Sequence, residues 1–313
     1  MLFLVRKARL GGRGSTALPV DRLQSLVATG QYLAAYREVE RLAMDPNLDA
    51  SLKARVFIAG VRAAAGLCDV YAAVKMAERA VECAELGSNW EDIGNARLHS
   101  ALIYREVGDT AQALRFFALF FQYLDRYPTL QAKTAYAYYN RALTHQQRRE
   151  YAEALQSYKL SIEDFDRLGD RTRVLACLQN SAWVCLLQGR PAEAEPFLVE
   201  ARTLGAQIEV PEYQVTQLVV EALFARQTGN PDRAVALCEE IFQEGRTGVQ
   251  DRHRAEAAWI LADLTLGAER LHEAGVFANW ALTHALQAKD PHLMNLASDV
   301  RQRVLLKQNE LRS

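Results

Sequence analysis

The chain has 313 residues, of which half are hydrophobic and 24% are charged. Its 37 lysines and arginines nearly balance 38 aspartates and glutamates, so no global field directs the chain to nucleic acid or an anionic membrane. We therefore expect neither nucleic acid nor a membrane among its partners. Glycine and proline are scarce, with 17 and 8 residues, and this composition favours helices.

The N-terminal segment does not resemble a signal peptide. Its apolar run covers only residues 2–5 and is followed by basic residues. No later stretch approaches the roughly 20 apolar residues of a membrane span, so we expect a cytoplasmic location. We predict that residues 1–17 form a flexible basic leader, or a cloning remnant. Five cysteines without a CxxC pair are expected to be reduced: Cys68, Cys83, Cys177, Cys185 and Cys238.

One alanine recurs through nearly the whole chain, at intervals of 38 to 41 residues. Such self-similarity is the signature of a repeat architecture. The seven positions are Ala35, Ala73, Ala113, Ala154, Ala194, Ala234 and Ala274. Five residues earlier we expect a turn in the left-handed conformation that glycine adopts most easily. Those positions hold Gly30, Cys68, Gly108, Arg149, Gly189, Gly229 and Glu269.

A second small or aliphatic position lies twelve residues before each alanine. It holds Leu23, Val61, Ala101, Ala142, Ala182, Ala222 and Ala262. Small side chains at both positions allow two antiparallel helices to approach closely. Each repeat is therefore predicted to be a helical hairpin, and seven hairpins fill residues 18–290.

Capping residues agree with these boundaries. Asn230 before Pro231, and Asp290 before Pro291, read as an N-cap followed by proline in the first helical position. Ser88 with Glu91 three residues later predicts a capping box.

The segments at residues 108–113, 150–155 and 229–234 resemble the turn and second-helix start of tetratricopeptide repeats. The period departs from that family, because it is near 40 rather than about 34 residues. The resemblance implies an all-α, right-handed superhelical solenoid of seven antiparallel hairpins. Residues 291–313 would form a C-terminal capping helix, with one apolar face. That face would comprise Leu293, Leu296, Ala297, Val300, Val304 and Leu311.

The lengthened repeats are similar to those of kinesin light chains and bacterial peptide-pheromone receptors. Those families bind extended peptides on a concave surface lined by the first helix of each hairpin. The resemblance therefore implies a protein-binding or peptide-binding groove here. Our candidate groove residues are Arg55, Arg62, Asn95, His99, Arg105, Tyr136, Tyr139, Asn140, Gln179, Asn180 and Trp183.

Asn140 and Asn180 occupy equivalent positions forty residues apart. An asparagine amide offers both a donor and an acceptor to an extended backbone. In related peptide-binding repeats such asparagines hold the ligand main chain, so the resemblance implies the same role. The alternative is that both are polar residues on a solvated inner wall.

Arg55, Arg62 and Arg105, together with His99, would make the N-terminal half of the groove basic and suited to carboxylates or phosphate. Alternatively, the arginines are solvated or paired internally. Tyr136, Tyr139 and Trp183 are either interface anchors or core residues.

An aromatic cluster lies on the second helix of the third repeat, and it either packs between hairpins or forms an exposed surface for self-association. It comprises Phe116, Phe117, Phe120, Phe121 and Tyr123.

Known catalytic and phosphate-binding motifs are missing from the sequence, and its six histidines show no metal-ligand spacing. We therefore expect no enzyme activity, no cofactor and no metal. The favoured function is a peptide-binding or protein-binding scaffold. The alternatives are a peptide-responsive regulatory receptor that acts on a signalling or transcription partner, and a homo-oligomeric assembly platform.

Overall fold

The computed structural model describes residues 17–124, 128–243 and 246–311. The predicted leader lies outside the described residues, except that Ala17 already begins the first helix. The chain divides into two compact units, residues 1–130 (unit 1) and 131–313 (unit 2). Each unit is described by itself. No helix in the described ranges is both long and apolar enough to cross a membrane.

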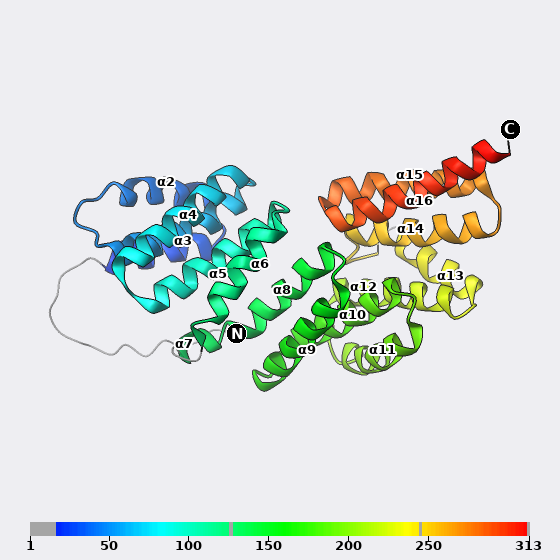
Figure 1. Ribbon diagram of the computed structural model, residues 1–313, viewed down its shortest axis with the longest axis horizontal. Helices are drawn as coiled ribbons and strands as arrows, with labels where there is room; N and C mark the ends of the chain where they lie inside the picture. Colours follow the sequence, from blue (N-terminus) through cyan, green and yellow to red (C-terminus); the bar gives the residue numbers. More distant parts are fainter. Residues whose placement is uncertain (1–16, 125–127, 244–245, 312–313) are drawn as a thin grey trace. The chain divides into compact units, whose positions relative to one another are not determined.

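Unit 1 contains three helical hairpins (Figure 1). The first helices, α1, α3 and α5, pack side by side, while α2 packs on α3 and α4 on α5. A four-residue helix, α7, ends at the unit boundary, where Leu130 is buried against Gly94. The helices are α1 (Ala17–Ala28), α2 (Tyr32–Ala43), α3 (Ala50–Gly66), α4 (Val70–Gly87), α5 (Trp90–Glu106), α6 (Thr110–Phe121) and α7 (Pro128–Gln131).

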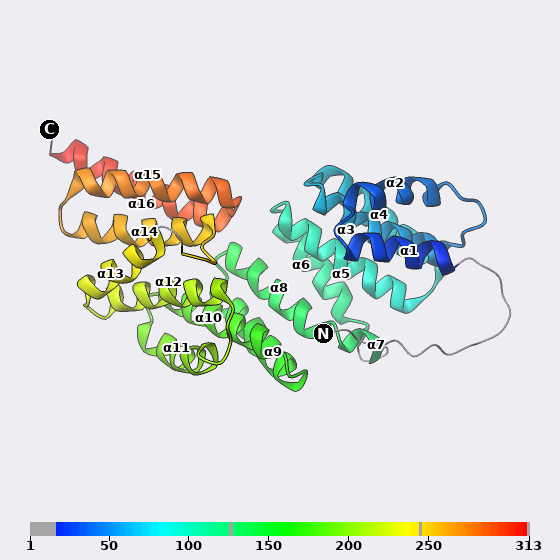
Figure 2. The same ribbon diagram turned by 180° about the vertical axis from the view of Figure 1, so that it is seen from behind.

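Unit 2 contains four hairpins and a final single helix, α16 (Figure 2). Its first helices α10, α12 and α14 pack in succession, and α16 takes the next place against α14 and α15. Helix α16 also contacts α8. The helices are α8 (Thr134–Gln147), α9 (Tyr151–Arg167), α10 (Arg171–Leu187), α11 (Pro191–Gly205), α12 (Pro211–Gln227), α13 (Pro231–Phe242), α14 (Asp251–Gly267), α15 (Leu271–Ala288) and α16 (Pro291–Glu310).

The recurring alanine is buried in every hairpin. All seven alanines have 0% exposure. The seven positions twelve residues earlier are also buried. Because a methyl group keeps the two helix axes close, the partner helix covers the alanine completely. The predicted seven antiparallel hairpins are confirmed.

The turn five residues before each alanine is confirmed as well. All seven residues have positive φ, from 58° at Cys68 to 83° at Gly108. Three of them, Cys68, Arg149 and Glu269, carry a side chain in a conformation that is strained for residues other than glycine.

Two predicted caps are confirmed and the capping box is wrong. Asn230 accepts a hydrogen bond from the Arg233 amide at 3.2 Å, and Asp290 accepts from the His292 amide at 2.9 Å. Ser88, by contrast, ends α4 in the left-handed conformation. Asn89 directly precedes α5 and caps it, because its side-chain oxygen reaches the first free amides of that helix.

The capping helix is present as α16, beginning at Pro291. Leu293, Ala297, Val300 and Val304 are buried on its apolar face. Leu311 is 78% exposed because the helix ends at Glu310, so its assignment to that face was wrong.

The aromatic cluster of α6 packs within unit 1. Phe117 and Phe120 are fully buried. Phe116 stacks on Tyr104 with ring centroids 5.6 Å apart, and Tyr123 stacks on Trp90 at 5.2 Å. The cluster is therefore explained by packing between hairpins rather than by an exposed surface for self-association.

The turn residues yield a paired prediction on stability. Glu269→Gly should raise the free energy of unfolding by about 1 kcal/mol, because glycine relieves the left-handed strain. Gly229→Ala, at the equivalent turn, should lower the free energy of unfolding by about 1 kcal/mol, because alanine is strained in the left-handed conformation. No neighbouring atom lies within 4 Å of an added Cβ, so a steric clash does not contribute. Urea unfolding followed by circular dichroism measures both. Shifts of the same sign in the two variants would contradict the strain argument.

Candidate functional site

Five candidate groove residues lie along α3 and α5 of unit 1, and we call this surface the α3–α5 face. It comprises Arg55, Arg62, Asn95, His99 and Arg105. The Nε of Arg55 donates to Oδ1 of Asp92 at 2.8 Å, and the Ser51 hydroxyl donates to the other oxygen of this buried carboxylate. The hydrogen bond to Asp92 raises the pKa of Arg55. Arg55 therefore ties α3 to α5, which is the internally paired alternative.

Arg62 and Arg105 differ from Arg55. Arg62 is exposed, Arg105 is half-buried, and neither forms an ion pair or side-chain hydrogen bond with any residue that the structure describes. The Nε of Arg105 is buried without an acceptor. Asn95 and His99, on α5, are half-buried and have contacts of their own. The α3–α5 face thus presents two guanidinium groups whose charge no described carboxylate neutralises.

The two asparagines of unit 2 adopt matched geometry. Nδ2 of Asn140 donates to the Tyr136 carbonyl at 2.8 Å, and Nδ2 of Asn180 donates to the Ala176 carbonyl at 2.9 Å. Neither Oδ1 accepts a hydrogen bond from a described residue. Each acceptor therefore remains unused, although the residues are only 2% and 5% exposed.

The predicted aromatic residues of unit 2 separate into one exposed and two inner rings. Tyr136 is 41% exposed. The hydroxyl of Tyr139 accepts from Nδ2 of Asn180 at 3.3 Å, and burial raises the pKa of Tyr139. Trp183 is buried in T-shaped contact with Trp259 at 5.9 Å. Trp183 and Tyr139 thus act in packing in the structure as it stands.

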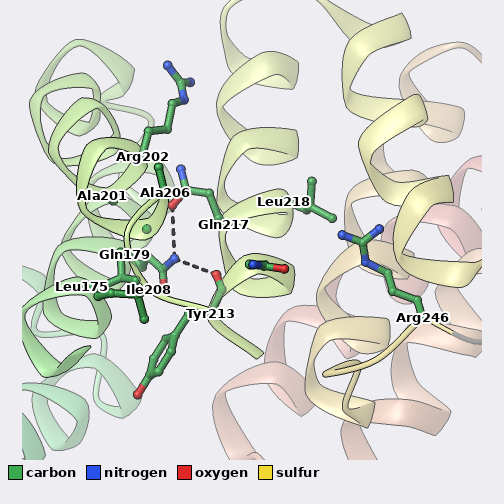
Figure 3. A pocket seen from close by; sticks show the side chains of 12 residues that line it. Leu175, Gln179, Ala201, Arg202, Ala206, Ile208, Tyr213, Gln217, Leu218 and Arg246 are labelled. Carbon is green, nitrogen blue, oxygen red and sulfur yellow. Dashed lines mark hydrogen bonds between the residues drawn. The ribbon is translucent and has the colours of Figure 1, made fainter. Parts of the chain in front are cut away.

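Gln179 faces the neighbouring hairpin. Its Nε2 donates to the Tyr213 carbonyl at 2.9 Å and to Oε1 of Gln217 at 3.2 Å (Figure 3). The Gln217 amide in turn donates to Glu221. Gln179, Tyr213 and Gln217 border a cavity of about 310 Å³ between α10, α11 and α12. Gln179 therefore lies beside this cavity and apart from the Asn180 side chain.

The burial of the inner residues differs from the solvated groove expected from the sequence. In unit 2, α16 contacts α8, so the first and last of its inner helices meet. Charged residues are buried on the inner side of unit 2 as well. Nε of Arg252 donates to the buried Glu256 at 3.0 Å. The charge of Glu256 raises the pKa of Arg252. The sequence analysis missed this pair, although its four-residue spacing on α14 is that of a helical ion pair.

Two buried histidines flank the pair. Nδ1 of His253 accepts from the Gln250 amide at 3.1 Å, so its Nε2 donates to Thr216 at 3.0 Å. His292, on α16, has both ring nitrogens buried with no partner in the described ranges. Burial lowers the pKa of each histidine to about 4, and for His292 Arg149 and Arg252 act in the same direction against Asp290.

Residues 133–205 match the family model described as tetratricopeptide repeat. This segment covers α8 to α11, where the hairpins of unit 2 begin. No curated protein sequence matches the chain.

Solved structures show the same fold over most of the chain. The apo form of RapI shares 15% identity and a TM-score of 0.67, covering 87% of this chain and 98% of its own. NprR in complex with its cognate peptide NprX shares 13% identity and a TM-score of 0.66, with coverage of 95% and 85%. A tetratricopeptide repeat protein from Parabacteroides merdae shares 15% identity and a TM-score of 0.60, with coverage of 90% and 98%. At such identities the likeness establishes the fold.

The buried His292 should make the free energy of unfolding depend on pH. Because its pKa is about 4 in the folded protein against 6.5 as the ordinary value, the unfolded chain takes up the proton first as the pH falls. The contribution of His292 to stability is therefore constant above about pH 6.5 and decreases below it. His292→Leu should remove roughly 2 kcal/mol of the loss between pH 7.5 and about pH 5. Urea unfolding at both pH values tests this, and an unchanged pH dependence in the variant would contradict it.

Proposed function

We propose that this chain of tetratricopeptide-like hairpins is a non-catalytic scaffold that binds an extended, acidic segment of another protein on the α3–α5 face. The observation that carries the proposal is the pair of arginines, Arg62 and Arg105, without a carboxylate partner among the described residues. Guanidinium groups bind carboxylates or phosphate in bidentate geometry. A partner segment with such groups would supply the missing counter-charges.

An extended segment fits this face better than a folded domain. Consecutive first helices present their side chains in parallel rows, so a chain lying across them can contact each helix in turn. The likeness of fold to NprR in complex with its cognate peptide NprX supports a peptide as the ligand type. The proposal includes a cytoplasmic location, and the five free cysteines suit a reducing compartment.

Asn140 and Asn180 form a second proposed contact surface, within unit 2. Their unused Oδ1 atoms would accept hydrogen bonds from ligand main-chain amides. Both residues are at most 5% exposed, so a ligand that binds their side chains would have to rearrange the inner surface of unit 2 around them. Such a rearrangement favours a peptide-responsive receptor as the second candidate function.

Binding of acidic peptides to the arginine pair can be tested with peptides that the protein selects from a random library displayed on phage. Selected peptides should be rich in aspartate and glutamate. Arg62→Ala with Arg105→Ala should weaken the best peptide by roughly tenfold or more, as expected for two charge-assisted hydrogen bonds. Fluorescence anisotropy of the labelled peptide measures the affinity.

The control variant is Arg79→Ala with Arg115→Ala. It removes the same charge from exposed positions on the second helices α4 and α6 of unit 1. Its affinity for the peptide should change by less than about twofold, because exposed charges at a distance are screened. Equal losses in the two double variants would show a general charge effect and overturn the assignment to the α3–α5 face.

A separate test addresses the asparagines. Asn140→Ala with Asn180→Ala should weaken by about tenfold a library peptide whose affinity the Arg62, Arg105 variant leaves unchanged, the value for losing two ordinary hydrogen bonds. Asn279→Ala with Asn309→Ala is the control, because both residues are exposed. Titration calorimetry and a thermal melt of each variant separate binding from folding. Unchanged affinity in a folded Asn140, Asn180 variant would remove the asparagines from the site.

A further inference from the structure

A second cavity, of about 410 Å³, lies between the second helices α13 and α15 of unit 2 and has α14 as its floor. Figure 1 shows α14 between these two helices. Three aromatic rings line the cavity. The Trp280 ring lies 6.0 Å from Phe242 and 5.7 Å from Phe277, and it is nearly perpendicular to Phe277. Trp280 is 47% exposed, so part of its ring is accessible to a ligand.

The charges around these rings add up to one negative charge. Glu273 pairs with Arg270 at 3.2 Å, so these two neutralise each other. Glu239 is exposed and has no ion pair with a described residue. On the floor, the Thr265 hydroxyl donates to carbonyls of its own helix at 2.7 and 3.1 Å. Its proton therefore does not face the cavity, and the unpaired Glu239 carboxylate dominates the electrostatics.

Helix α13 ends at Phe242, and Arg246 beyond it pairs with Glu240 at 2.7 Å, so this pair adds no net charge. The cavity therefore combines three aromatic rings and one unpaired carboxylate.

We propose that this cavity binds a small quaternary ammonium cation of the choline type. Aromatic rings attract cations through their quadrupole, and quaternary ammonium ions are the cations most often bound by clusters of such rings. Methyl groups around the nitrogen also make apolar contact with the rings. A cavity of this volume is within the range of small-ligand sites. The site lies on the second helices, separate from the α3–α5 face and from the asparagines.

Choline itself is the probe, and 3,3-dimethyl-1-butanol is its neutral isostere. Saturation-transfer NMR on the methyl groups of each compound detects binding to the full chain. Choline should bind with a dissociation constant of roughly 1 to 10 mM, as for other ligands of so few heavy atoms. The neutral isostere should show at least about tenfold weaker binding, because it lacks the cation–π attraction.

Two variants locate the site. Trp280→Leu should abolish the choline signal. Glu239→Gln should weaken choline binding about threefold or more, since it removes only an exposed charge and leaves the fold intact. Trp90→Leu is the matched control, because Trp90 is a similarly exposed tryptophan in unit 1, and it should bind choline as the wild type does.

Three results would overturn the proposal. These are no choline signal at concentrations of about 20 mM, equal binding of choline and its isostere, or wild-type binding by both Trp280→Leu and Glu239→Gln. Nα-acetyl-lysine methylamide is included as a third probe. Binding of this lysine analogue without binding of choline would also overturn it, because the site would then recognise a protein side chain.

Discussion

The close approach of two helices at a buried alanine is the contact on which the rest of the structure depends. The same methyl group is fully covered in all seven hairpins, at nearly constant spacing along the chain. A larger side chain there would separate the helix axes and expose the apolar surface that holds each hairpin to the next. Because each hairpin contacts chiefly its neighbours, its side chains away from these contacts are free to serve recognition.

The two units use this freedom differently. In unit 1 the α3–α5 face keeps an exposed Arg62 and a half-buried Arg105 without counter-charges. In unit 2 the inner helices meet through α8 and α16, so polar groups such as Asn140 and Glu256 are buried. Burying such groups is costly unless they are hydrogen-bonded or paired. Arg252 meets this requirement for Glu256, whereas the Oδ1 atoms of the two asparagines remain as unused acceptors.

The sequence predicted the local structure well, because local structure depends on single residues. Seven alanines and seven turn positions were sufficient to locate every hairpin, and even Cys68 and Glu269 adopt positive φ as predicted. The Ser88 capping box failed because Asn89, one residue later, offers the same chemistry nearer the helix. Leu311 failed because periodicity continues past the point where α16 ends.

The site was less predictable, because it depends on how far successive hairpins curve. A register assigns residues to one helix face, but it does not say whether that face is open. Trp183 occupies the same repeat position as Arg62, and Asn140 and Asn180 lie three residues earlier in their repeats, yet all three are buried. The contact between α16 and α8 joins segments about 150 residues apart in the chain. No pattern within one repeat encodes such a contact.

Hydrogen–deuterium exchange with a bound library peptide tests most directly whether a partner segment binds the α3–α5 face. Binding there should slow exchange in α3 and α5, while the second helices α4 and α6 exchange as in the free protein. Protection confined to α4 and α6, with α3 and α5 unchanged, would contradict it.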